Sequence, residues 1–93
     1  MYFHTILNNK VLQLKLHDCE KEIKERQYLV GMELEHESGT HKIKVDALDP
    51  FEISGTGLHY IRCRYYKQNE DGVYGTTLLA NKLNDLLTYY IAY

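Results

Sequence analysis

The 93-residue sequence lacks tryptophan, has one proline and two cysteines, and contains no long hydrophobic run. Cys19 and Cys63 form no CxxC motif and are too few for a cysteine-based metal site. We expect two reduced, partly buried thiols, and a single disulfide is the alternative. No segment approaches the roughly 18 apolar residues of a membrane helix, and the N-terminus does not resemble a signal peptide. The sequence therefore predicts a cytoplasmic protein without a membrane partner.

An excess of charge of one sign is also lacking. The formal net charge is -2 and the pI is about 6.2, which argues against a strongly basic DNA-binding protein and against an acidic mimic of nucleic acid. Apolar residues make up 44% of the chain and charged residues 26%, as in an ordinary globular protein. A chain of this length has room for one domain, residues 1–93, with a single core.

The common catalytic motifs are absent as well: there is no nucleophile elbow, Walker loop, HExxH or dinucleotide fingerprint. Gly55-Thr56-Gly57 precedes no predicted helix, so no helix terminus directs its amides at an anion. Glu33 and Glu35 lie two apart on one predicted strand face, but the lysines opposite would keep them ionised, which does not suit a general acid. The sequence predicts a protein without a cofactor and without enzymatic activity.

The segment 77–92 has the clearest helical periodicity in the chain. Its apolar residues recur every three or four positions, and polar residues gather on the opposite side. The apolar stripe consists of Leu79, Leu83, Leu86 and Tyr90. The sequence predicts an amphipathic helix that begins near Thr76 or Thr77, either of which can cap it.

Upstream, apolar and polar residues alternate with the period of a β-strand, in predicted hairpins over 2–16, 28–48 and 58–75. Asn8-Asn9 suits the turn of the first hairpin, and Asn69-Glu70-Asp71-Gly72 that of the third. Residues 17–27 are polar and form either one or two helical turns capped by Asp18 or a charged loop. Asp49-Pro50 is expected to end a strand, and 51–54 to form a brief edge strand.

A turn at Ser38-Gly39 sets the register of the second hairpin. This register places apolar side chains opposite one another on one face and glutamates opposite lysines on the other, and a one-residue slip would destroy both sets. The predicted pairs are Leu34 with Ile43, Met32 with Val45, Val30 with Ala47, Glu35 with Lys42 and Glu33 with Lys44. The predicted fold is α+β, with an antiparallel sheet of about five or six strands packed against one C-terminal amphipathic helix.

The strand 58–67 carries the main candidate site. Alternation along the strand brings two arginines and two tyrosines to one face. These predicted partner-binding residues are Tyr60, Arg62, Arg64 and Tyr66. Such a row suits a protein interface, or a nucleic acid whose bases stack on the rings and whose phosphates meet the guanidinium groups. The alternative is a solvated charge ladder in which the arginines pair with Glu33, Glu35 or Glu37.

Two further clusters are candidates. His36 and His41 face each other beside the Ser38-Gly39 turn, but the sequence supplies too few additional ligands for a metal, so a pair of histidines that repel each other when protonated is favoured. The tyrosine-rich end of the chain exceeds what one helix face can bury, which predicts self-association as a homodimer, and packing of the first hairpin over these rings is the alternative. The self-association residues are Tyr89, Tyr90, Ile91 and Tyr93.

These features predict a small non-enzymatic interaction protein that occludes or scaffolds a macromolecular partner, foremost a protein. Nine tyrosines, and lysine in excess of arginine, are typical of an AT-rich coding source. A phage or mobile-element protein that inhibits a host system fits this description. Two alternatives remain: a nucleic-acid-binding module, and a metal-independent ribonuclease that would use His59, Arg62, Arg64 and a tyrosine.

Overall fold

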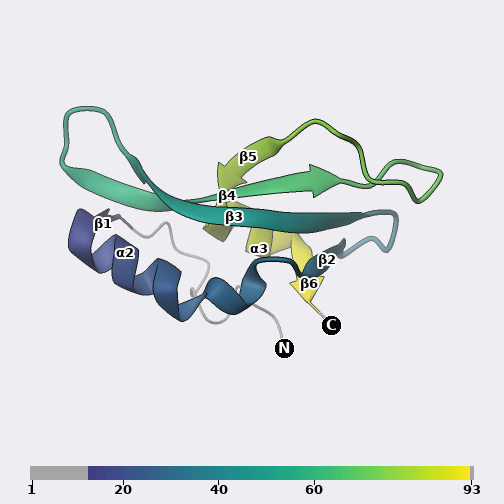
Figure 1. The fold of residues 1–93 in the computed structure, drawn as a ribbon, viewed down its shortest axis with the longest axis horizontal. Helices are drawn as coiled ribbons and strands as arrows, with labels where there is room; N and C mark the ends of the chain where they lie inside the picture. The colour runs from purple at the N-terminus through teal and green to yellow at the C-terminus, as the bar shows by residue number, and fades with distance from the viewer. Residues whose placement is uncertain (1–12, 93) are drawn as a thin grey trace.

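The computed structural model describes residues 13–92, and within them it has the predicted α+β architecture, with six strands and two α-helices (Figure 1). The elements are β1 (Leu14–Lys15), α2 (Leu16–Glu25), the 3-10 helix η1 (Gln27–Leu29), β2 (Glu33–His36), β3 (Lys42–Glu52), β4 (Leu58–Lys67), β5 (Leu79–Lys82), α3 (Leu83–Tyr89) and β6 (Tyr90–Ala92). Most of the predicted hairpin over 2–16, including its Asn8-Asn9 turn, lies outside the described residues. Only its end appears, as β1.

The strands that pair within residues 13–92 do so in antiparallel fashion, in the order β1-β4-β3-β2-β6. β3 and β4 form the long central pair. The other edge of β4 is shared by β1, at Leu58 and His59, and by β5, at residues 62–65. Figure 1 shows α2 and α3 on the same side of the central pair, so the sheet has one covered face, here called the inner face, and an outer face.

The core lies between the inner face and the helices. Its buried residues come from α2, η1 and α3 and from one side of β2, β3 and β4. They are Cys19, Ile23, Leu29, Leu34, Ile43, Val45, Leu48, Ile61, Cys63, Leu83, Leu86 and Leu87. All the strand residues in this set point to the inner face, so the two described helices leave the outer face uncovered.

The hairpin of β2 and β3 has the predicted register near its turn. Glu33 pairs with Lys44, Leu34 with Ile43 and Glu35 with Lys42. The apolar pair is fully buried while the glutamates and lysines stay outside. The alternation of apolar and polar residues therefore determines which residues face the core, as expected for a strand pair with one buried face.

Beyond this point the predicted pairing of Val30 with Ala47 is wrong, because β2 begins only at Glu33 and Val30 caps the 3-10 helix η1. On its other side, β3 has a β-bulge against β4. Val45 pairs with Tyr65 and Ala47 with Arg64, so Asp46 has no partner on β4. One extra residue reverses the alternation of the strand. After the bulge Leu48, rather than Ala47, enters the core, and Asp49 lies on the outer face beside Arg62.

Pro50 does not end the strand, contrary to the prediction, since β3 continues to Glu52. The amide of Ile53 donates to the carbonyl of Leu58, and hydrogen-bonded pairs alternate along an antiparallel ladder. Counting back from that bond, Pro50 opposite Ile61 occupies a position whose nitrogen points away from β4. The missing N–H of proline therefore removes no ladder hydrogen bond.

Helix α2 resolves the open prediction for residues 17–27 in favour of a helix. Cys19 and Ile23, one turn apart, are its buried residues. The N-cap is Lys15 rather than Asp18, which was expected as the cap. Asp18 lies in the first turn, where the positive end of the helix dipole stabilises its carboxylate. Arg26 follows the helix and forms an ion pair with Glu22.

The C-terminal helix is shorter than the predicted 77–92, because both ends of that segment are strands. Leu83, Leu86 and Leu87 form its buried stripe, as the periodicity predicts. Residues 79–82 instead pair as β5 with β4, and residues 90–92 pair as β6 with β2. Helical hydrogen bonds here would leave the backbone groups of those two sheet edges without partners, so tertiary pairing outweighs a weak local preference.

The third hairpin returns along β4 after its turn, as predicted, but the returning residues form no regular strand. An isolated bridge joins Gln68 and Tyr74, and two hydrogen bonds flank it, from the Asn69 amide to the Val73 carbonyl and from the Gly75 amide to the Lys67 carbonyl. The regular neighbour of β4 on this edge is β5.

Deleting Asp46 tests the role of the bulge. The deletion removes the extra residue and keeps Ala47, Leu48 and Asp49 opposite their present partners on β4, so Leu48 should stay in the core and we expect the free energy of unfolding to change by less than about 1 kcal/mol. Asp46→Ala keeps the chain length and should change the free energy of unfolding by no more than about 0.5 kcal/mol. Urea denaturation of the three proteins measures both values. A loss of more than about 3 kcal/mol in the deletion variant would contradict the assignment of Asp46 as the extra residue.

Candidate interaction surface

The alternation predicted for β4 is confirmed. Ile61 and Cys63 are buried in the core, and the residues that alternate with them along the strand are half-exposed on the outer face. The structure brings the predicted row together there as Tyr60, Arg62, Arg64 and Tyr66. At about 3.3 Å per residue the row extends about 20 Å along the strand.

One carboxylate binds both arginines of the row. Arg62 Nε lies 2.8 Å from Asp49 Oδ1, and a terminal nitrogen of Arg64 lies 2.8 Å from Asp49 Oδ2. The charge ladder considered from sequence placed glutamates of 33–37 in this role, whereas the partner is an aspartate on β3. One negative charge shared by two guanidinium groups leaves one positive charge without a counterion in this cluster.

Two residues that the sequence reasoning missed extend the row into a layered aromatic and cationic surface. Phe51 of β3 stacks on Tyr60, with ring centroids 5.1 Å apart. The guanidinium carbon of Arg62 lies 4.9 Å from the centroid of Phe51, and Lys82 Nζ lies 5.1 Å from that of Tyr60. The sequence signal for Phe51 was its place in an extended run, but only the bulge brings it to the outer face.

Tyr66 lies at the other end of the row, away from the Phe51 stack. It lines a separate hollow of about 500 Å³ together with Lys44, Asp46 and Tyr74. The bulge residue Asp46 thus contributes to this hollow. The predicted row therefore consists of two parts, a charged aromatic stack at one end and a tyrosine-lined hollow at the other.

The two histidines beside the turn lie together as predicted. Their rings stack with centroids 4.8 Å apart, and His41 Nε2 shares a 2.8 Å hydrogen bond with the Tyr90 hydroxyl. Burial, then the positive charges of Lys67 and His36, lower the pKa of His41. Within the described residues no group of three His, Cys, Asp or Glu is arranged to hold a metal.

The predicted self-association residues do not form one exposed cluster. Tyr89 is 53% exposed, whereas Tyr90 is half-buried and bonded to His41. Ile91 lies in β6, at the edge of the described sheet opposite Glu35. Tyr93 lies outside the described residues.

The arrangement expected for a ribonuclease is not formed. His59 is on the inner face of β4, opposite Leu14 of β1, and its Nδ1 is buried without a hydrogen-bond partner among the described residues. Arg62 and Arg64 point to the outer face. His59 and the two arginines therefore lie on opposite faces of β4.

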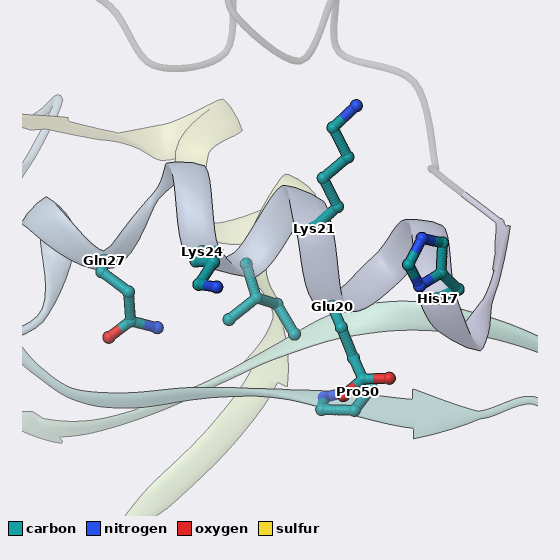
Figure 2. A pocket seen from close by; sticks show the side chains of 7 residues that line it. His17, Glu20, Lys21, Lys24, Gln27 and Pro50 are labelled. Carbon is teal, nitrogen blue, oxygen red and sulfur yellow. The ribbon is translucent and has the colours of Figure 1, made fainter.

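A larger hollow of about 650 Å³ lies between α2 and Pro50 of β3. Figure 2 shows that its polar groups do not converge: Glu20 extends toward Pro50 on the strand, whereas Lys21 extends away from the sheet. The charges of Glu20 and Lys21 therefore point in different directions in this hollow.

Both cysteines are free and fully buried, which confirms the prediction of reduced thiols. Burial, and then the nearby Asp49 carboxylate, raise the pKa of Cys63 to about 12. Burial raises the pKa of Cys19 as well. Because the thiolate is the reactive form, neither residue suits nucleophilic catalysis.

No protein-family model, curated protein or solved structure matches this chain. None of the helices within residues 13–92 has both the length and the apolarity needed to cross a bilayer.

The histidine pair predicts an acid-dependent loss of stability. His41 has a lower pKa in the folded protein than its ordinary value of 6.5, so the unfolded chain takes up this proton first and stability falls as the pH drops below that value. The loss ends once the pH passes the lowered pKa. Between about pH 7.5 and about pH 5, His41→Gln should therefore lose less stability than the wild type, as measured by urea denaturation. If both proteins lose the same stability over this pH range, His41 is not the source of the loss.

Proposed function

We propose that this chain is a non-enzymatic interaction protein whose outer sheet face binds and occludes a macromolecular partner, foremost another protein. The observation that carries the proposal is the stack of Phe51 and Tyr60 with Arg62 above it, on a face that neither described helix covers. Tyrosine and arginine are among the residue types most enriched at binding hot spots.

Preorganisation supports this proposal. Asp49 holds both guanidinium groups, and the aromatic stack restrains Arg62 further. Side chains that are already ordered lose less conformational entropy on binding. The positive charge that Asp49 leaves without a counterion, together with Lys82, favours a partner surface that carries carboxylates.

A cytosolic inhibitor of a host system, encoded by a phage or mobile element, is the role we favour within this class. Its support is the small size, the lack of a convergent catalytic constellation in the described residues and the tyrosine-rich composition. The two free, buried thiols fit a reducing compartment.

Substitutions on the outer face test the proposal. After a partner is identified by cross-linking in a host lysate, Tyr60→Ala and Arg62→Ala should each weaken its affinity by about 1 to 3 kcal/mol in isothermal titration calorimetry. Tyr28→Ala and Lys24→Ala, which remove exposed residues away from this face, should leave the affinity unchanged. If the outer-face variants bind as tightly as the wild type, the outer face is not the interface.

Single-stranded nucleic acid is the alternative partner, because rings and cations alternate on one face of the sheet. The salt dependence of the affinity distinguishes a nucleic-acid partner from a protein partner. The affinity for nucleic acid falls steeply with salt concentration. Arg62→Ala, which would remove one phosphate contact, should reduce the slope of log affinity against log salt by about 1. A shallow dependence that Arg62→Ala leaves unchanged favours the protein partner.

We further propose that two copies associate through β6. Within the described residues β6 pairs with β2 on one side and has no strand on the other, and an open strand edge is a template for pairing with a second copy. Sedimentation equilibrium should show a dimer at high concentration, and Ile91→Lys should abolish it. Val73→Lys, at an exposed apolar residue elsewhere, should leave it intact. A single-chain mass at every concentration rules out the dimer.

A further inference from the structure

A second hollow, of about 500 Å³, lies beside α3 and has a different character from the outer face. Its walls come from five elements, β2, β4, β5, α3 and β6, so it forms only when the C-terminal segment folds back onto the sheet. The residues that line it include four with rings, an asparagine and an aspartate. They are His36, Tyr65, Tyr89, Tyr90, Asn81 and Asp85.

The rings form a corner. The planes of His36 and Tyr89 lie within 9° of each other, whereas Tyr90 is tilted by 86° from His36. Tyr90 therefore stands nearly perpendicular to Tyr89. The hydrogen bond of Tyr90 to His41 and its partial burial fix one wall, and the exposed Tyr89 forms the other.

A carboxylate completes the site. Asp85 precedes Tyr89 by four residues, so the two side chains lie on the same side of α3. Among the described residues Asp85 has no salt-bridge partner, in contrast to Asp49 on the outer face. The Asp85 carboxylate and the rings of Tyr89 and Tyr90 thus line one hollow.

We propose that this hollow binds a quaternary ammonium cation. The faces of aromatic rings carry negative potential and attract cations, and sites for choline and methylated lysine use such walls. A trimethylammonium group makes no hydrogen bonds, so it fills a corner of rings without needing several acceptors. The site lies on the inner-face side of β4, away from Tyr60 and Arg62, and so does not depend on the function proposed for the outer face.

Titration with choline, followed by amide chemical shifts in NMR, tests the proposal. Shifts should concentrate at residues 36, 65, 81, 85 and 88–90, and the neutral tert-butyl analogue of choline, which has the same shape, should not produce them. A short peptide with one trimethyllysine forms the second arm. Tighter binding of the peptide identifies a modified protein as the source of the cation, and equal binding identifies a free amine.

Matched variants measure how much Tyr89 and Asp85 contribute to choline binding. Tyr89→Ala and Asp85→Asn should each weaken choline binding about two- to fivefold, as expected for exposed cation–π and charge contacts. Tyr89→Phe keeps the ring and should retain binding. The controls are Tyr28→Ala, which removes a tyrosine of similar exposure, and Asp71→Asn, in a distant turn. Equal binding of choline and its neutral analogue, or shifts located elsewhere in the wild type, would overturn the proposal.

Discussion

The alternation of side chains along β3 and β4 is the constraint on which the rest of the structure depends. Ile61 and Cys63 must face the helices, and this requirement sends Arg62 and Arg64 to the other side of the sheet. A strand with one buried face has only one acceptable phase. The core and the candidate interaction surface are therefore two consequences of the same register.

The bulge at Asp46 matches β3 to this phase. Without it, the odd-numbered positions of β3 would stay on the inner face, which would bury the carboxylate of Asp49 and expose Leu48. The inserted residue reverses the phase and brings Asp49 and Phe51 beneath the arginines. A local irregularity of the backbone thus determines the electrostatics of the outer face, because the ion pairs and the aromatic stack all lie downstream of it.

The C-terminal segment shows a competition between local and tertiary preferences. Its leucines have helical spacing, and the helix forms where they can be buried, at Leu83, Leu86 and Leu87. On both sides the open edges of β4 and β2 offer backbone hydrogen bonds, and residues 79–82 and 90–92 take them. The same rearrangement places Tyr89 and Tyr90 beside His36 and creates the aromatic hollow.

The sequence by itself determined the α+β class, the register of β2 with β3 near the turn and the outward phase of Tyr60, Arg62, Arg64 and Tyr66, because these follow from local periodicity. Tertiary structure alone decided the partner of the arginines, the ends of α3 and the aromatic hollow. Each of these depends on contacts between residues distant in sequence, such as Asp49 with Arg64 or His41 with Tyr90. Periodicity specifies which side of its own element a residue faces, whereas its neighbours there depend on how the elements pair.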